Sequence, residues 1–236
     1  MKIALIGYGK MGKEIEKISI KRKHEIICKV DKNSELKNLN GADIAINFCT
    51  PKTAYKNIEF ALKKSIPVVS GTTGWISNIN KIEKLSKIKK TGFLYSSNFS
   101  LGVNLFFKLN KNLAEIMKKQ NQYSLNIEET HHVEKIDKPS GTAIKLANDI
   151  IEKGLYKKWS ESNQKESIPI KSFRVDHEPG SHVVKYNSEI DSLEIKHTAK
   201  NRKGFALGAV IAAEWIVNKK GIFTMSDVIN DLSFKF

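Results

Sequence analysis

Cysteines, arginines and long apolar runs are all scarce in this sequence. The two cysteines, Cys28 and Cys49, each lie in an apolar, strand-like run without metal-ligand spacing, so buried reduced thiols are expected rather than a disulfide or a metal site. This use of cysteine fits a reducing cytoplasm. The apolar stretch at the start is short and opens into glycines, and no later stretch has the length of a membrane span. Neither a signal peptide nor a membrane protein is therefore expected.

The basic charge is large but diffuse. The formal net charge is +15, and only three of the 40 basic residues are arginines, the rest being lysines spread along the chain. A nucleic-acid surface would show a sustained basic run interleaved with aromatic residues, and neither occurs. We interpret the charge as a lysine-rich solvated surface that would still attract a small anionic substrate or a dinucleotide. Arg174 and Arg202 lie near other polar motifs, which favours planar contacts that lysine cannot make.

Strands and helices are predicted to alternate through the first hundred residues. Helical patterns follow the first, third and fourth of five apolar, strand-like runs at 2–6, 25–30, 44–48, 67–70 and 92–95. Parallel neighbours need a crossover, which is usually a helix. The rhythm therefore predicts an α/β fold with a Rossmann-like, doubly wound parallel sheet.

The pattern changes after about residue 100. Helices are expected near 103–118 and 142–152, and strands at 124–129, 168–175, 182–187 and 192–197. This order predicts a smaller α+β domain whose sheet is mixed or antiparallel with one wet face. A polar surface loop is expected at 157–166. The apolar helical segment 204–218 is expected to pack back on the first domain.

A glycine-rich turn follows the first predicted strand. Gly7, Gly9 and Gly12 form Gly-x-Gly-x-x-Gly between strand and helix, and Asp31 ends the second strand 19 positions later. Such glycines allow a tight turn, close approach of a pyrophosphate and tight helix packing, so the motif predicts dinucleotide binding rather than an ordinary turn. Asp31 would accept hydrogen bonds from the adenosine ribose, which favours NAD. Lys32 either neutralises the 2′-phosphate of NADP or is one more surface lysine.

Three further loops follow predicted strands at their carboxyl ends, where open α/β sheets bind ligands. They are Phe48 to Pro51, Gly71 to Gly74 and Ser96 to Phe99. The small residues and hydroxyls of the second loop let its backbone come close to a nicotinamide or a ribose, although ordinary turns have the same composition. Phe99 either stacks on the nicotinamide ring or belongs to the core.

The segment 129–142 contains two histidines, Lys135 and a Ser-Gly-Thr turn among few apolar residues, so core packing does not explain it. The helix predicted at its end offers free amides and a positive dipole end to a carboxylate. Lys135 adds a cation and the turn adds hydroxyl donors. Because histidine titrates near neutrality, His131 or His132 is a candidate proton carrier beside this anion site.

This segment resembles the signature of the dihydrodipicolinate reductase family, His-His-x-x-Lys-x-Asp-x-Pro-Ser-Gly-Thr-Ala, which stands at 131–143 without a gap. Matching pieces extend along nearly the whole chain, including the glycine turn, the loops after the third and fourth strands, and residues 98–104 and 197–209. The resemblance implies an oxidoreductase that uses NADH or NADPH to reduce the cyclic imine dicarboxylate from 4-hydroxy-tetrahydrodipicolinate to tetrahydrodipicolinate, in diaminopimelate and lysine biosynthesis. It also implies a homotetramer built by the sheet of the second domain.

On this resemblance, residues 1–100 form the dinucleotide-binding domain, completed by 203–236, and residues 101–202 form the substrate-binding and oligomerisation domain. His131 would be the acid/base residue and Lys135 a proton donor or charge stabiliser, with their division of labour open. The substrate carboxylates would be held by His132, Ser140, Gly141, Thr142 and Arg202. The expected cofactor contacts are Gly7, Tyr8, Gly9, Lys10, Met11, Gly12, Asp31, Lys32, Phe48, Thr50, Gly71, Thr72, Thr73, Ser96, Ser97, Asn98 and Phe99. No metal is expected.

Two departures and two rival functions remain. The family often has Ala-Pro where this chain has Ser96-Ser97, and often a glycine near Asp176, but neither change removes a chemical group. One rival is a non-catalytic sensor of the NADH to NAD ratio, against which the proton donor at 131–142 argues. The other is an aspartate- or homoserine-type dehydrogenase. Consumption of NADH on adding the family's substrate, and growth rescue of a diaminopimelate auxotroph, separate these alternatives.

Overall fold

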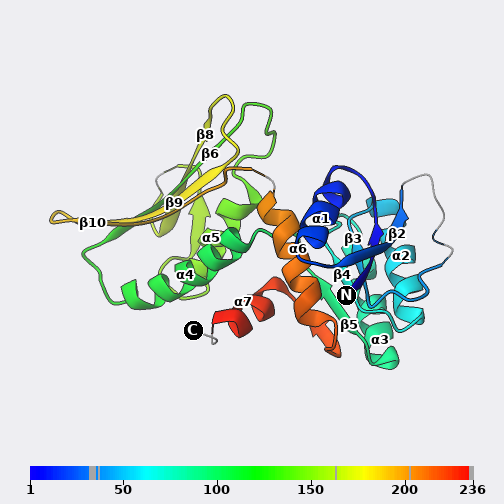
Figure 1. Cartoon of the computed structure of the whole chain (residues 1–236). Coiled ribbons are helices and arrows are strands. Elements are labelled where there is room, and N and C mark those ends of the chain that lie inside the picture. The colour runs from blue at the N-terminus through cyan, green and yellow to red at the C-terminus, as the bar shows by residue number, and fades with distance from the viewer. Residues whose placement is uncertain (32–35, 37, 163, 202, 234–236) are drawn as a thin grey trace. The chain divides into compact units, whose positions relative to one another are not determined.

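A computed structural model describes residues 1–31, 36, 38–162, 164–201 and 203–233, and the chain divides into two compact units (Figure 1). Unit 1 comprises Met1–Asn104 and Lys203–Phe236, and unit 2 comprises Leu105–Arg202. Among the residues described, no helix combines the length and the apolarity that crossing a membrane requires.

Unit 1 is built on sheet A, in which six parallel strands run in the order β11-β5-β4-β3-β1-β2. The strands are β1 (Lys2–Ile6), β2 (Glu25–Val30), β3 (Ile44–Asn47), β4 (Val68–Ser70), β5 (Gly92–Tyr95) and β11 (Gly221–Phe223). Side chains of β1 alternate between two cores, with Ile3 and Leu5 in one and Ala4 and Ile6 in the other. Both faces of sheet A are therefore buried.

Helices supply the other half of each core. They are α1 (Lys10–Lys21), α2 (Pro51–Lys63), α3 (Ile79–Lys89), α6 (Lys203–Ile216) and α7 (Met225–Ser233), with a short 3₁₀ turn η1 (Ile76–Asn78) before α3. Residues of α1, α6 and α7 pack on the face of Ile3, and residues of α2 and α3 pack on the face of Ala4. The predicted doubly wound parallel sheet is confirmed. Neither the strand β11 nor the helix α7 was predicted. β11 has three residues, which is too short for a periodic signal.

Unit 2 is built on sheet B, a mixed sheet in the order β10-β9-β6-β8-β7. The strands are β6 (Ser124–His131), β7 (Lys158–Ser160), β8 (Ser167–Arg174), β9 (Ser181–Asn187) and β10 (Ser192–Thr198). β9 is antiparallel to β6 and β10, whereas β8 is parallel to β6 and β7. The mixed sheet is confirmed. The segment 157–166 was expected to be a polar loop, but it contains strand β7. Trp159 pairs with Ile168 of β8, and the neighbouring strand imposes the extended backbone.

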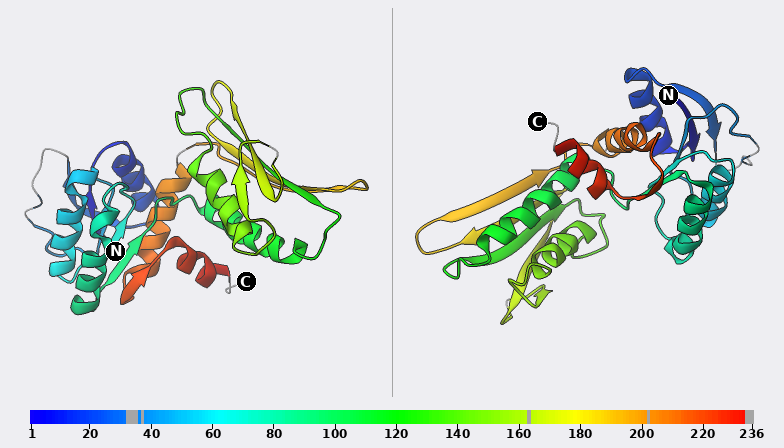
Figure 2. Two further views of the ribbon diagram at one scale, coloured as in Figure 1. Left: turned by 180° about the vertical axis from the view of Figure 1, so that it is seen from behind. Right: turned by 90° about the horizontal axis from the view of Figure 1, so that it is seen from below.

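Two helices, α4 (Leu101–Met117) and α5 (Gly141–Ile151), lie along one face of sheet B (Figure 2). We call this the covered face and the opposite side the open face. Strand β6 alternates between them, so that Leu125, Ile127, Glu129 and His131 are buried on the covered face. β9 repeats the pattern with His182, Val184 and Tyr186. Because β6 runs two residues further than expected, His131 is the last residue of a strand rather than part of a loop.

Candidate functional site

The turn between β1 and α1 in unit 1 has room for a phosphate. Gly7 has φ +98°, and a Cβ there would lie 2.2 Å from the carbonyl oxygen of Phe48. A Cβ on Gly12 would lie 2.3 Å from the carbonyl oxygen of Gly7, whereas one on Gly9 would meet nothing within 4 Å. Gly9 caps α1 without a side-chain hydrogen bond, and the first turn of α1 has no acidic residue. The turn therefore fits the pyrophosphate of a dinucleotide.

Side chains next to this turn are tied to one another. The hydroxyl of Tyr8 donates to the Glu16 carboxylate, and Lys29 Nζ lies 2.5 Å from Glu16 Oε1 and 4.9 Å from the centroid of the Tyr8 ring. Lys10 is exposed and Met11 is half-buried against the core. Asp31 directly follows β2 and is exposed. The predicted residues Lys32 and Arg202 lie outside the described residues.

The other predicted cofactor loops follow β3, β4 and β5. Thr72 is buried, and its Oγ1 donates to the carbonyl oxygen of Cys49 at 3.2 Å, which ties two of the loops together. Ser96 Oγ donates to the carbonyl oxygen of Asn98 at 2.8 Å. Phe99 is 2% exposed and its ring lies 5.6 Å from that of Phe48, so it belongs to the core. The exposed members of this set are Thr50, Thr73 and Ser97, and Gly71 is half-buried.

In unit 2, polar residues gather at one end of the covered face of sheet B. The sheet register explains the grouping, because Glu129 pairs with His182 across β6 and β9, and His131 pairs with Arg174 across β6 and β8. The rings of His131 and His182 have centroids 5.0 Å apart and meet edge to face. We call Glu129, His131, Arg174 and His182, with Ser140 at the start of α5, the histidine cluster.

The carboxylate of Glu129 is the centre of this cluster. Its Oε2 pairs with Nδ1 of His131, and its Oε1 accepts a hydrogen bond of 3.0 Å from Nη1 of Arg174. Burial raises the pKa of Glu129, but hydrogen bonds from His131, Ser172 and Arg174 outweigh it and lower the pKa to about 2. Glu129 is therefore an anion at neutral pH, although only 1% of it is exposed.

His182 and Ser140 form a second hydrogen bond in the cluster. Burial lowers the pKa of His182 to about 3, with repulsion from His131 as the next cause, so this ring is neutral at physiological pH. Ser140 Oγ lies 3.0 Å from Nε2 of His182 and accepts a hydrogen bond from the amide of Ala143 at 3.2 Å. The hydroxyl proton thus points to His182. Ser140 is 2% exposed and acts as the N-cap of α5.

The loop after β6 presents the second predicted catalytic side chain. Lys135 Nζ lies 2.7 and 2.8 Å from the carboxylate oxygens of Asp137, and this hydrogen bond lowers the pKa of Asp137. His132 and Thr142 are half-buried. A Cβ on Gly141 would meet nothing within 4 Å, so the backbone at the start of α5 is open to a ligand.

The sequence prediction missed one member of the cluster and a glycine beside it. His182 was not singled out, although the alternation of β9 places it on the same face as Val184 and Tyr186. Gly180 was also missed. It has φ +137°, and a Cβ there would lie 3.0 Å from Nε2 of His131, so only glycine leaves room for that ring.

By composition, the cluster resembles a metal site. One ligand atom from each of Glu129, His131 and His182 lies within 4.8 Å of the others. The Arg174 guanidinium, however, already bonds the same carboxylate, and it would repel a dication placed beside Glu129. The direct pairing of Glu129 with His131 gives both groups a partner without a metal.

Comparisons with known proteins cover nearly the whole chain. The family model described as dihydrodipicolinate reductase, N-terminus, matches residues 1–99, and the one described as dihydrodipicolinate reductase, C-terminus, matches residues 102–229. The 4-hydroxy-tetrahydrodipicolinate reductase of Christiangramia forsetii is 51% identical over 98% of this chain and 99% of its own. That of Thermosipho africanus is 36% identical over 98% and 99%. The solved structure of dipicolinate-bound dihydrodipicolinate reductase from Paenisporosarcina sp. TG-14 has the same fold, with a TM-score of 0.80 at 22% identity, covering 96% of this chain and 99% of that one.

Proposed function

The chain belongs to the dihydrodipicolinate reductase family, and from that membership we propose where and how it carries out its reaction. It reduces the cyclic imine dicarboxylate from 4-hydroxy-tetrahydrodipicolinate to tetrahydrodipicolinate with NADH or NADPH, a step of diaminopimelate and lysine biosynthesis. The proposal is that unit 1 binds the dinucleotide and that unit 2 binds the substrate at the histidine cluster. The observation that carries it is a histidine whose Nδ1 is engaged by a buried carboxylate, in the strand that leads into the signature loop.

The substrate carboxylates are bound at the start of α5 and by His132. The related enzyme from Paenisporosarcina binds dipicolinate, a ring with two carboxylates, which supports the same class of ligand here. The amides of Gly141 and Thr142 lie at a helix N-terminus whose dipole favours an anion. Ser140 contributes by holding this turn in place, because its hydroxyl is committed to His182 and to the helix cap.

Two side chains stabilise the charge that develops on the substrate. When bound, the nicotinamide supplies the hydride. Addition of that hydride to the ring moves an electron pair towards the ring nitrogen, so a cation and a proton donor nearby lower the barrier. Lys135, whose Nζ is hydrogen-bonded to Asp137, supplies the cation. His131 supplies the proton from Nε2, since Nδ1 is engaged by Glu129.

The dinucleotide is held by the glycine turn, Asp31 and the strand-end loops of unit 1. The pyrophosphate is bound at Gly9 and the first turn of α1, and the adenosine ribose at Asp31. The space at Gly9, which no Cβ fills, supports this placement. The nicotinamide end is held by backbone and hydroxyl groups of the loops after β4 and β5.

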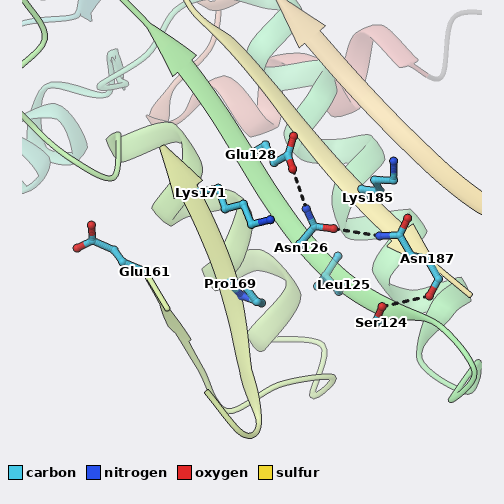
Figure 3. A pocket seen from close by; sticks show the side chains of 9 residues that line it. All are labelled: Ser124, Leu125, Asn126, Glu128, Glu161, Pro169, Lys171, Lys185 and Asn187. Atoms are coloured by element: carbon cyan, nitrogen blue, oxygen red, sulfur yellow. Dashed lines mark hydrogen bonds between the residues drawn. The ribbon is translucent and has the colours of Figure 1, made fainter. Parts of the chain in front are cut away.

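A homotetramer in the cytoplasm completes the proposal. The open face of sheet B has a hollow of about 510 Å³ lined by Asn126, Glu128, Lys171, Lys185 and Asn187 (Figure 3). Asn126 donates to Glu128 and accepts from Asn187, which arranges a polar surface suited to a hydrogen-bonded contact between copies. The free thiols of Cys28 and Cys49 fit a reducing compartment. Light scattering of the purified protein tests the assembly, and a monomer would refute it.

The chemistry is tested by following NADH and NADPH absorbance as substrate is added to the wild type and to Lys135→Ala. Removal of the cation is expected to lower kcat by about 10²- to 10⁴-fold, the range typical of such assistance, while the Kd for NADH stays nearly constant. Lys165→Ala, at an exposed position of the loop before β8, is the matched control and is expected to match the wild type. Equal losses of turnover and NADH affinity would show that Lys135 is structural instead.

A further inference from the structure

Glu129 is a buried carboxylate that makes no contact with the substrate in the proposed mechanism. Its side chain is fully buried, and a buried anion is costly unless it is paired and hydrogen-bonded. Both oxygens are paired here, Oε2 with Nδ1 of His131 and Oε1 with Nη1 of Arg174. Burying this charge is costly, and Glu129 lies directly against His131. We therefore expect Glu129 to influence proton transfer by His131.

The pairing fixes the chemistry of His131. A carboxylate can only accept a hydrogen bond from Nδ1, so in the neutral ring the hydrogen is held on Nδ1 and the lone pair on Nε2. Among the described residues, none hydrogen-bonds Nε2, and Gly180 adds no side chain at this edge of the ring, where a Cβ would lie 3.0 Å from Nε2. Glu129 therefore selects the ring atom that exchanges protons and stabilises the imidazolium when that atom is protonated.

Arg174 joins this pair to the loop of Lys135. Besides Glu129, its guanidinium donates from Nε to the carbonyl oxygen of Lys135 at 3.2 Å and from Nη2 to that of Asp137 at 2.7 Å. With the carbonyl oxygen of Phe173, 2.8 Å from Nη1, the guanidinium has four acceptors. Acceptors at these fixed angles require the planar fork of arginine, which lysine does not have. One side chain of β8 thus restrains both the end of β6 and the loop that follows it.

We infer that Glu129 and Arg174 are positioning residues of the reduction. Glu129 orients His131 and sets its tautomer, and Arg174 holds Glu129 and the Lys135 loop in one arrangement. Neither residue touches the substrate in this scheme. The inference rests on the proposed roles of His131 and Lys135 in proton transfer and charge stabilisation.

A double-mutant cycle with Glu129→Gln and His131→Asn separates this inference from the proposal beneath it. Glutamine keeps the shape of Glu129 but removes the charge, and we expect kcat to fall at least about tenfold with KM and NADH affinity nearly unchanged. In the His131→Asn background the same change is expected to alter kcat less than about twofold, because its target is gone. An equal cost in both backgrounds would overturn the inference. Unchanged turnover in His131→Asn alone would instead overturn the proposed function.

Further variants guard against a folding defect and against a metal. Thermal unfolding is measured for each variant, and Glu152→Gln, an exposed carboxylate at the end of α5, is expected to match the wild type in kcat. Should Glu129→Gln fail to fold, Arg174→Lys tests the same arrangement, and it is expected to lower kcat without changing the Kd for NADH. Wild-type turnover in Arg174→Lys would overturn the inference. A loss of wild-type turnover with a chelator, restored by zinc, would also overturn it by assigning the cluster to a metal.

The tautomer itself is measurable. In protein labelled with ¹⁵N at histidine, the neutral form of His131, observed at high pH, is expected to show Nδ1 protonated and Nε2 bare in the wild type, and Glu129→Gln is expected to give a mixture of both tautomers. A variant that loses turnover while His131 keeps the wild-type tautomer would show that Glu129 acts in another way.

Discussion

At the glycine turn of unit 1 the decisive feature is the lack of side chains, whereas at the histidine cluster of unit 2 it is a set of side chains committed to one another. A Cβ on Gly9 would enter open space, and the amides of α1 behind it have no side-chain cap. In the cluster, by contrast, Glu129 and Ser140 each bond two groups of the protein. A cofactor that many enzymes share needs space and backbone donors, while proton transfer to one substrate needs a fixed ring.

The largest expected effect comes from adding methyl groups to the turn. Gly12→Ala places a Cβ 2.3 Å from the carbonyl oxygen of Gly7, so it is expected to destabilise the fold and abolish NADH binding. Overpacking of this kind costs about 1–3 kcal/mol in the free energy of unfolding. Gly9→Ala is the matched control for stability, because its Cβ meets nothing, and the unfolding free energy is expected to change by less than about 1 kcal/mol.

Gly9→Ala should nevertheless weaken NADH at least about tenfold, or about 1.4 kcal/mol, because the methyl group occupies the space where the pyrophosphate approaches. Calorimetric titration of both variants with NADH, beside denaturant unfolding, measures the two effects separately. If Gly9→Ala bound NADH with unchanged affinity, the open space at Gly9 would not be where the pyrophosphate binds, and the contrast between the two sites would fail.

The next largest effect is the pH dependence of the free energy of unfolding, which we expect to come from the buried histidine cluster. The pKa of His182 is lowered from 6.5 to about 3 in the folded protein, so below pH 6.5 the unfolded state binds the proton more readily. Stability is therefore complete above pH 6.5 and is lost as the pH falls towards 3. The contribution of His182 is about 2 kcal/mol between pH 7 and pH 5.

Urea unfolding at pH 7 and pH 5 checks this expectation against His182→Gln, which keeps an acceptor for Ser140 and has no titrating ring. The variant is expected to lose less stability than the wild type over this interval. Glu129 adds a second loss only at lower pH, because its pKa falls from 4.5 to about 2 on folding and its contribution fades as the pH drops through that range. Identical pH profiles for the wild type and His182→Gln would mean that the ring is not held neutral.

The smallest effect concerns Asp31, the side chain of unit 1 predicted to recognise the adenosine ribose. Asp31→Ala is expected to weaken NADH more than NADPH and to shift the ratio of their Kd values by up to about tenfold, or about 1.4 kcal/mol. The loss of an anion also removes repulsion from a 2′-phosphate, which works in the same direction. Titration with both dinucleotides gives the ratio, and a constant ratio would remove Asp31 from cofactor selection.

The comparison also explains what was predictable from the sequence. The glycine turn is local, because its three glycines and the flanking strand and helix are contiguous in the chain, and Gly7 and Gly12 have the close contacts that the motif requires. His131, Lys135 and the start of α5 were visible for the same reason. Arg174 and His182 join the cluster through the pairing of β8 and β9 with β6, from 45 and 42 residues away from their partners Glu129 and Ser140.

Pairing between distant strands has no local signal, which is why these partners were not assigned. The same reason covers β7, a polar segment that is extended because it pairs with β8. For Arg174, the sequence predicted planar contacts but not the groups that it contacts. Its partners became visible only once the register of sheet B placed it opposite His131.

Strand β6 interleaves two sets of residues one position apart. Glu129 and His131 face the cluster, while Asn126, Glu128 and Thr130 face the open side. Each set can change by substitution without moving the other, so catalysis and surface contacts can diverge independently among descendants of this gene. A one-residue deletion or insertion within the strand is different, because the shift would exchange the two sets completely. Strand β6 can therefore accept substitutions, but not a change in its number of residues.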